Sequence, residues 1–212
     1  MKLAVFGGTG KTGRPLLEQA LAAGHEVRAL VRDPGKLPLS LSGHERLELI
    51  QGDALDPEAV ARTVKGVDAV LSVLGQTKGS PPDLVTRATE NILAAMHAHG
   101  VRRIVTLTGA GVPDPRDRPK LIDRVFTFLL KRLSGAVLED GEQHAARLKA
   151  SGLAWTVVRA PRLTNGPHTG SYRVGFVGKD SGVQVSRADV ADFMLQEVAS
   201  SRFVQQMPVV TS

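Results

Sequence analysis

Three glycines spaced three residues apart, Gly7, Gly10 and Gly13, directly follow a short apolar run that starts at Leu3. After them, apolar residues recur with a helical period, and this pattern stops at Gly24. A buried strand that breaks into such a turn and continues as a helix brings a pyrophosphate onto the N-terminus of that helix. The segment therefore predicts a bound nucleotide, and the alternative is an ordinary flexible loop.

Each glycine has its own expected role. Gly7 permits the tight turn, Gly10 lets the backbone approach the phosphates without a Cβ atom, and Gly13 lets the helix pack closely on the strand. The letters Gly10-Lys11-Thr12 also resemble the end of an NTPase phosphate loop. That motif needs a glycine five positions earlier, where the chain has Val5, so its spacing fails.

Length and composition favour one domain over residues 1–212, because 212 residues with 42% hydrophobic content can bury one substantial core. No apolar run approaches the roughly 20 residues needed to cross a bilayer, and no signal-peptide pattern precedes the first strand. We therefore expect a cytoplasmic protein with no membrane partner. The absence of cysteine excludes disulfides, thiolate metal sites and cysteine nucleophiles, and we expect no metal site.

The net charge of +6 raises the question of a nucleic-acid partner, since basic residues gather between Arg102 and Arg132. Tyrosine and tryptophan occur once each, so few rings could stack on bases, and acidic residues at positions 114, 117 and 123 interrupt the basic stretch. We therefore expect no nucleic-acid partner. A solvated face, or attraction toward an anionic cofactor and substrate, explains the charge better.

Strand and helix patterns alternate through the first 110 residues and predict five β-α steps. The strand candidates are Leu3–Phe6, Glu26–Val31, Arg46–Gln51, Val67–Leu74 and Ile104–Leu107. This alternation predicts a doubly wound parallel α/β sheet in a three-layer α/β/α arrangement. A ligand then lies outside the carboxyl ends of the strands, which puts the informative residues at 7–13, 32, 53, 75 and 108–111.

The second half, residues 111–212, is less regular, and we expect it to supply most of the substrate-side elements. An apolar stripe over Leu121–Leu133 predicts one helix, whose stripe fits core or a dimer face better than a substrate lid. The remaining candidates are a second helix over Glu139–Lys149, strands over Leu153–Val158, Gly170–Val177 and Phe203–Val210, and a final helix over Asp189–Val198.

Arg32 stands at the end of the second strand, where the adenosine ribose lies in sheets of this type. An arginine there accommodates the 2′-phosphate of NADP, so the sequence favours NADPH over NADH, and a solvent-exposed strand end is the alternative. Lys36 and Arg14 could add positive charge, whereas Asp33 before Pro34 is explained as a turn or cap residue.

Asp53 closes the third strand, where its carboxylate could accept a hydrogen bond from the adenine amino group or could simply form a turn. Gly75 ends the fourth strand, where a missing side chain would let the cofactor ribose lie close to the backbone. The alternative for Gly75 is an ordinary turn glycine.

A series of short motifs runs in order along nearly the whole chain: Phe6 to Gly13, Val27 to Pro34, Gly52-Asp53, Asp68-Ala69-Val70, Leu74-Gly75, Asn91-Ile92, His99-Gly100-Val101, Ser151-Gly152-Leu153 and Ser186 to Asp189. Together they resemble the atypical short-chain dehydrogenase/reductase proteins with an NAD(P)H-binding domain, within them the flavin reductase or biliverdin-IXβ reductase type. The segment from Pro113 to Leu138 looks longer than in that reductase and matches least.

The resemblance implies a Rossmann-like sheet and NADPH as cofactor. The cofactor-binding residues that we expect are Gly7, Gly8, Thr9, Gly10, Lys11, Thr12, Gly13, Arg32, Lys36, Asp53, Ala54, Leu74, Gly75, Thr108 and Gly109. It also implies a flat conjugated acceptor, a flavin or a linear tetrapyrrole, held against the nicotinamide. We expect a flavin, a quinone or a similar acceptor, and a monomer or homodimer. Hydride transfer to such an acceptor needs mainly parallel stacking and a proton from solvent or a nearby donor.

The chain departs from the family pattern at the catalytic positions. Its one tyrosine, Tyr172, has Phe176 four residues on instead of lysine, which argues against carbonyl reduction by a tyrosinate. Where the reductase type has a serine after a threonine, Thr108 is followed by Gly109. Thr108 is therefore the catalytic candidate, with a simple strand-end residue as the alternative.

Two further residues could contact the acceptor. Arg162, next to Pro161, could draw in an anionic acceptor, or it could be a solvated loop charge. His144 could serve as a proton donor, although a single histidine on a helix is more often a surface residue. A cofactor-binding sensor without turnover, similar to the NmrA-like regulators, is the competing hypothesis.

Overall fold

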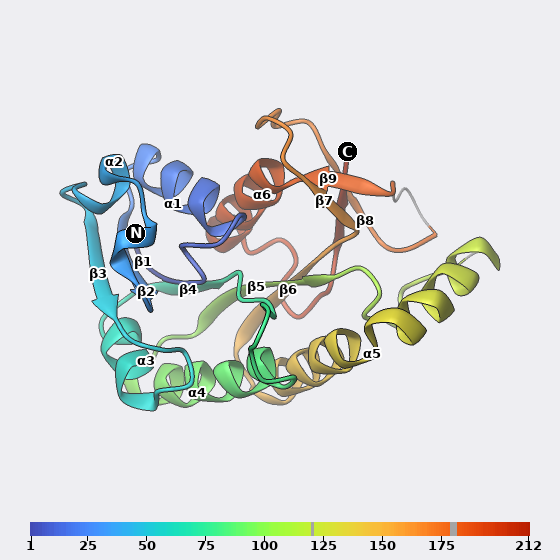
Figure 1. Ribbon diagram of the computed structural model, residues 1–212, viewed down its shortest axis with the longest axis horizontal. Coiled ribbons are helices and arrows are strands. Elements are labelled where there is room, and N and C mark those ends of the chain that lie inside the picture. Colours follow the sequence, from blue (N-terminus) through green and yellow to red (C-terminus); the bar gives the residue numbers. More distant parts are fainter. Residues whose placement is uncertain (120, 179–181) are drawn as a thin grey trace.

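The computed structural model describes residues 1–119, 121–178 and 182–212, and in the helix that begins at residue 121 it describes side chains from residue 135 onward. Its main sheet has eight strands in the order β3-β2-β1-β4-β5-β6-β10-β8, and all neighbours are parallel except β10 and β8 (Figure 1). The strands are β1 (Lys2–Phe6), β2 (Glu26–Val31), β3 (Leu47–Gln51), β4 (Ala69–Ser72), β5 (Arg103–Gly109), β6 (Ala154–Ala160), β8 (Arg173–Gly175) and β10 (Val209–Thr211).

Helices cover both faces of this sheet, as Figure 1 shows. One face carries α1 (Gly13–Ala22) and α6 (Arg187–Ser200), and the other carries α3 (Pro57–Val64), α4 (Leu84–His99) and α5 (Leu121–Ala150). The short helices η1 (Pro34–Lys36) and α2 (Leu39–Ser42) follow β2. The expected doubly wound, three-layer architecture is therefore confirmed.

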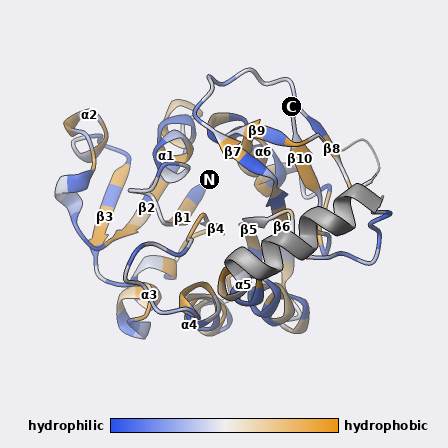
Figure 2. Cartoon of the chain, turned by 45° about the vertical axis from the view of Figure 1, so that its right-hand side comes forward, coloured by the Kyte–Doolittle hydropathy of each residue, from blue (hydrophilic) through white to orange (hydrophobic). Residues whose placement is uncertain are grey.

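The alternation of side chains along β1 explains why the sheet is covered twice. Leu3 and Val5 are buried among residues of α1 and α6, whereas Ala4 and Phe6 are buried among residues of α3 and α4. Figure 2 shows the hydrophobic residues along the strands and the hydrophilic ones on the outer sides of α3 and α4. Every position from Leu3 to Phe6 thus contributes to a core.

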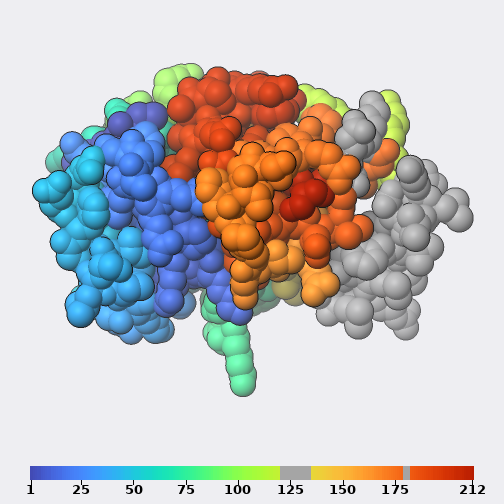
Figure 3. All heavy atoms as spheres, turned by 90° about the horizontal axis from the view of Figure 1, so that it is seen from above, coloured from blue at the N-terminus to red at the C-terminus, as the bar shows by residue number. Residues whose placement is uncertain are grey.

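The N-terminal and C-terminal parts of the chain meet along one face. Helix α1 packs beside α6, where Gln19 donates a hydrogen bond to the carbonyl of Ala188 at 2.9 Å. In the space-filling view of Figure 3, the first residues of the chain lie directly beside the C-terminal half. The contact places α1, which directly follows the opening loop, next to a helix that is more than 150 residues away in sequence.

Several predicted boundaries were wrong. Residues 121–150 form one helix instead of two, because no proline interrupts them and a glycine such as Gly135 costs only about 1 kcal/mol in a helix. The terminal strand is limited to β10, and the strand expected over 170–177 to β8. The apolar stripe expected over 121–133 involves side chains outside the described residues.

A second, two-stranded sheet was not predicted. Strands β7 (Arg162–Thr164) and β9 (Gln184–Ser186) pair in parallel beyond the end of β6. Each has three residues, too few to show a period in the sequence. Among the helices that the structure describes, none is both long and apolar enough to cross a bilayer.

A buried ion pair fastens the second half of the chain. The side chain of Arg159 in β6 is fully buried, and its guanidinium makes two hydrogen bonds to the Asp117 carboxylate, at 2.7 and 2.8 Å. Arg159 also donates to the carbonyls of Val112 and Met207, and Asp117 accepts from the backbone N–H of Val177 at 3.0 Å. One charge pair therefore joins the segment after β5, the segment after β8 and the entry to β10.

Candidate functional site

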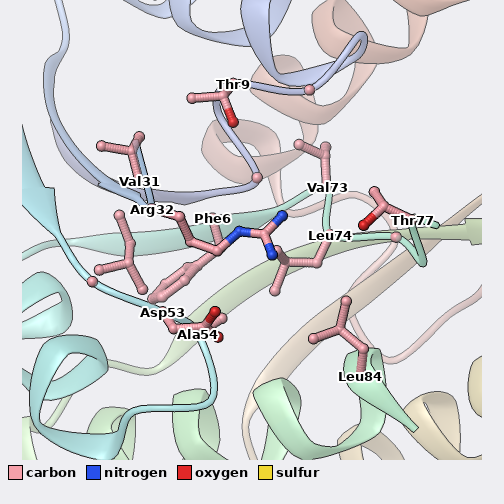
Figure 4. Close-up of a pocket in the computed structure, with 15 residues that line it drawn as sticks. Phe6, Thr9, Val31, Arg32, Asp53, Ala54, Val73, Leu74, Thr77 and Leu84 are labelled. Carbon is pink, nitrogen blue, oxygen red and sulfur yellow. The ribbon is translucent and has the colours of Figure 1, made fainter. Parts of the chain in front are cut away.

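A cleft opens between the carboxyl ends of β1 and β4, where the strand order reverses. In open α/β sheets this switch point is where ligands bind. The cleft contains about 680 Å³ of space open to solvent. Its lining residues are Phe6, Gly7, Thr9, Gly10, Leu30, Val31, Arg32, Gly52, Asp53, Ala54, Val73, Leu74, Gly75, Thr77 and Leu84 (Figure 4).

The opening loop has the geometry that its glycines predict. Gly7 has φ +86°, and a Cβ atom there would lie 2.9 Å from the Val73 carbonyl oxygen. The turn closes where the N–H of Gly10 donates to the carbonyl of Gly7 at 3.0 Å. A Cβ atom at Gly13 would overlap that same oxygen. The missing side chain of Gly13 therefore lets the helix pack against the turn, and not against the strand as expected.

The opening loop and the N-cap of α1 offer unpaired donors. Within the described chain, the backbone N–H groups of Thr9, Lys11 and Thr12 have no hydrogen-bond acceptor. Thr12, at the N-cap position, makes no capping bond through its side chain, and the first turn contains no acidic residue. Free N–H groups at a helix N-terminus attract anions. A Cβ atom at Gly10 would meet only the Gly7 carbonyl oxygen, at 3.2 Å, among heavy atoms within 4 Å.

Substitution of Gly13 by alanine tests the close approach of the helix to the turn. We expect Gly13→Ala to lower the free energy of unfolding by about 2 kcal/mol, because the added methyl group overlaps the Gly7 carbonyl and forces the helix and turn apart. Urea unfolding followed by circular dichroism measures this. The control is Gly75→Ala, since a Cβ atom at Gly75 meets nothing within 4 Å. Equal stability of the two variants would contradict the role of Gly13 in the close approach of helix and turn.

Arg32 extends across the cleft from the end of β2, with its guanidinium between Asp53 and Leu74 in the view of Figure 4. No carboxylate pairs with it among the residues that the structure describes. Asp33 instead caps η1 by accepting a hydrogen bond from the N–H of Gly35 at 3.0 Å, as its position before a proline predicted. The cation in the cleft is thus free for an anionic ligand.

Two other basic residues lie beyond the lining of the cleft. Arg14, in the first turn of α1, donates to the carbonyl of Lys36 at 2.8 Å. This bond ties the start of α1 to η1, which directly follows Arg32 and Asp33 in the chain. The sequence predicts that Arg14 and Lys36 could add positive charge near Arg32. The fold brings the segments that carry these three residues together.

Asp53 and Ala54 form the wall opposite the opening loop (Figure 4). One carboxylate oxygen of Asp53 accepts from the N–H of Leu55 at 2.8 Å, which makes Asp53 a turn residue as well as a lining residue. The side chain of Asn91 in α4 donates to the Ala54 carbonyl at 3.1 Å and braces this wall. The second carboxylate oxygen of Asp53 accepts no hydrogen bond from the residues that the structure describes.

Comparison with known proteins identifies the group to which the chain belongs. Residues 7–201 match the family model described as NAD(P)H-binding. The chain belongs to this NAD(P)H-binding family. Its relatives include a 3-diazoavenalumate denitrifying reductase of a Streptomyces species, 33% identical over 189 residues, or 82% of this chain and 60% of that protein.

Solved structures share the fold of this NAD(P)H-binding protein over its whole length. A short-chain dehydrogenase/reductase from Veillonella parvula, solved in complex with NADP, has a TM-score of 0.84 at 18% identity and is 94% covered. The anaerobillin reductase ChuY from Escherichia coli O157:H7 has a TM-score of 0.78 at 22% identity and is 97% covered. The expected family and its Rossmann-like fold are therefore confirmed.

The catalytic and substrate candidates lie outside the cleft lining. Gly109 pairs with Ala160 in the register of β5 and β6, so Thr108 and Pro161 sit at adjacent strand ends on the edge where the cleft opens. The hydroxyl of Thr108 faces α5, where a Cβ atom at Gly141 would lie 2.8 Å from it. Arg162 is exposed in β7.

The two interpretations offered for His144 are both wrong. Its side chain is buried between α5, α4 and β5, with 1% of its surface exposed. Nδ1 lies 2.7 Å from the hydroxyl of Thr89, and Nε2 lies 3.0 Å from that of Thr106. Because the Thr89 hydroxyl also donates to the Val85 carbonyl, the neutral form with the proton on Nδ1 satisfies all three groups. His144 thus faces neither the cleft nor solvent.

Burial makes His144 a pH-sensitive element of stability. Loss of solvation lowers the pKa of His144 to about 4, and the nearby Asp140 carboxylate only partly offsets this. The unfolded chain then binds a proton below pH 6.5 that the folded chain excludes. We expect His144 to reduce the free energy of unfolding by about 2 kcal/mol between pH 7.5 and pH 5.

Urea unfolding at both pH values measures this loss. In His144→Asn, which cannot be protonated, the difference between the two pH values should shrink by about 2 kcal/mol, whatever the cost of the substitution itself. An unchanged difference would contradict the assignment of the proton to His144.

Several residues that line the cleft were not identified from the sequence, nor was the residue that holds the loop after β4 in place. Val73, Thr77 and Leu84 line the cleft near the loop that follows β4. Strand ends and the start of the next helix are predictable places for such contacts. Asp140, which holds this loop from α5, gave no signal, because an acid inside a long helix usually faces solvent.

Proposed function

We propose that the protein is an NADPH-dependent reductase that passes a hydride to a flavin, a quinone or a similar flat conjugated acceptor. The observation that carries the proposal is the cleft at the switch point, which Arg32 lines together with the opening loop. The N–H groups of Thr9, Lys11 and Thr12 in this loop have no acceptor among the described residues. When bound, NADPH supplies the hydride. Family membership and the reductase among the relatives support the coarser assignment to NAD(P)H-dependent chemistry.

The residues of the cleft divide the work of binding. The N–H groups of Thr9, Lys11 and Thr12 hold the diphosphate, and Arg32 holds the 2′-phosphate with Arg14 and Lys36 adding positive charge. The free oxygen of Asp53 accepts from the adenine amino group. Leu74 and Gly75 leave room for the second ribose, because Gly75 has no side chain to obstruct it.

The acid–base groups favour an acceptor that needs little help from the protein. Arg32 and Asp53 are the charged residues among the described lining of the cleft. Tyr172 instead donates to Asp192 at 2.7 Å, and burial together with that hydrogen bond raises its pKa well above the ordinary value. A tyrosinate mechanism is therefore unfavourable, whereas reduction of a quinoid ring can take its proton from solvent.

The acceptor lies beyond Gly75, at the ends of β5 and β6. Thr108 at the end of β5 is the proposed hydrogen-bond donor, which requires its hydroxyl to turn from Gly141 of α5 toward the acceptor. The exposed Arg162 attracts an acceptor that bears negative charge. A cofactor-binding sensor without turnover is the second candidate, favoured by the lack of a strong proton donor among the described cleft residues.

The test is oxidation of NADPH followed by its absorbance with FMN, riboflavin and a panel of small quinones, beside a titration of NADPH binding. The reductase proposal expects saturable binding and turnover with at least one of these acceptors. Tight binding of NADPH with no acceptor reduced would refute the reductase and leave the sensor.

A further inference from the structure

Asp140 lies in α5, outside the cleft, and is buried with 4% of its surface exposed. Four donors surround its carboxylate: the N–H of Thr86 at 2.8 Å, the hydroxyl of Thr86 at 2.7 Å, the N–H of Val85 at 3.0 Å and the side-chain amide of Gln76 at 3.0 Å. No cation pairs with it in the described part of the chain. Its charge is stabilised by hydrogen bonds alone.

Three of these donors, the N–H of Val85 and the N–H and hydroxyl of Thr86, belong to the start of α4. Asp83 stands at the N-cap position of α4 but makes no capping bond through its side chain. Asp140 supplies that cap from the neighbouring helix, because it accepts the free N–H groups of Val85 and Thr86. The carboxylate thereby fixes where α4 begins.

The fourth donor belongs to the other end of the loop that leads into α4. Gln76 follows Gly75 directly after β4, and its amide donates to the Pro82 carbonyl as well as to Asp140. The loop over residues 75–84 is therefore held at both ends by one carboxylate. Both ends line the cleft, at Gly75 and Thr77 on one side and at Leu84 on the other (Figure 4).

We propose that Asp140 is a positioning residue for cofactor binding: through Gln76 and the first turn of α4, it fixes one wall of the cleft in the shape that receives NADPH. This inference rests on the proposed function. Helix α4 also braces the opposite wall through Asn91 and Ala54, so fixing its start keeps the two walls in register. A wall that is ordered in advance lowers the conformational cost of binding.

The experiment measures the Kd of NADPH by calorimetry for the wild type, Asp140→Asn, Gln76→Ala and the double variant. The amide group introduced by Asp140→Asn presents donors where the carboxylate accepted, and Gln76→Ala removes the donor after β4. We therefore expect each single variant to raise the Kd of NADPH about tenfold. The double variant should bind about as weakly as Asp140→Asn alone, because both substitutions break the same brace. A loss of about a hundredfold in the double variant would mean independent effects and would overturn the proposal.

Thr89→Val is the matched control. It removes a buried hydrogen bond between the same two helices, that to His144, and leaves the loop over residues 75–84 intact. It should lower the melting temperature but leave Kd within about twofold of the wild type. If Thr89→Val weakened NADPH as much as Gln76→Ala does, or if Gln76→Ala bound like the wild type, the positioning role would be refuted.

In this experiment, failure of NADPH binding itself and failure of the positioning role of Asp140 give different results. A wild type that does not bind NADPH would refute the proposed function itself. A wild type that binds, with unchanged Kd in Asp140→Asn and Gln76→Ala, would refute only the role of Asp140. If Asp140→Asn does not fold, Gln76→Ala decides alone, since it leaves the cap of α4 in place.

Discussion

Arg32→Ala is expected to raise the Kd of NADPH about 100-fold and that of NADH less than about threefold. The guanidinium lies across the cleft without a carboxylate partner among the described residues, so the 2′-phosphate would be its counter-ion. Charge-assisted hydrogen bonds to a phosphate are about twice as strong as neutral ones. Calorimetric titration of both coenzymes gives the ratio that the account predicts.

Arg102→Ala separates this local contact from general attraction. Arg102 is exposed and precedes β5, at the amino edge of the sheet and far from the carboxyl edge that forms the cleft. The substitution removes the same charge, but it should leave the Kd of both coenzymes unchanged. Equal losses of NADPH and NADH affinity in Arg32→Ala would contradict the assignment of Arg32 to the 2′-phosphate.

Asp117→Asn is expected to reduce the free energy of unfolding by about 3–5 kcal/mol, because it leaves the fully buried guanidinium of Arg159 without a counter-charge. The loss should extend to the three segments that the pair joins, at Val112, Val177 and Met207. Urea unfolding followed by tryptophan fluorescence measures it, since Trp155 lies in the same strand as Arg159.

The control for this prediction is Glu90→Gln. Glu90 and Arg147 form a pair at 2.6 Å, as short as that of Asp117 and Arg159, but both side chains are about half exposed. Exposed pairs contribute less than about 1 kcal/mol, so the control should stay close to the wild type. Comparable losses in the two variants would mean that burial does not set the contribution of the pair.

The same ion pair sets a limit of stability in acid. Burial by itself raises the pKa of Asp117, but hydrogen bonds from Arg159, Asp114 and Val177 and the charge of Arg159 together hold that pKa below its usual value of 3.8. The unfolded chain therefore takes up the proton first, and the stabilisation present above about pH 4 is lost as the pH falls through the lower folded pKa. Asp117→Asn should lack this component of acid unfolding.

The parts of the site that could be predicted are those that depend on residues close together in the sequence. The turn at Gly7 and the approach at Gly13 follow from steric limits within a few residues, and Arg32 follows from its place at a strand end. The alternation of strands and helices likewise predicted the layered, doubly wound sheet. These predictions needed no knowledge of distant contacts.

The parts that could not be predicted depend on which distant segments meet. Asp140 caps a helix from a position more than 50 residues further along the chain, and Arg159 pairs with Asp117 across 42 residues. The sequence predicts a surface or cleft position for His144, because nothing in it shows that Thr89 and Thr106 surround this side chain. Polar groups in such networks look like ordinary surface residues until the fold brings them together.

The most direct test of the central claim is a calorimetric titration of NADPH into the wild type and into Gly10→Val. A Cβ atom at Gly10 would approach only the Gly7 carbonyl, at 3.2 Å, so the variant should fold, while its side chain occupies the space of the diphosphate. The account predicts one saturable site in the wild type and no measurable heat of binding in the variant. Equal binding by both proteins, or none by the wild type, would contradict it.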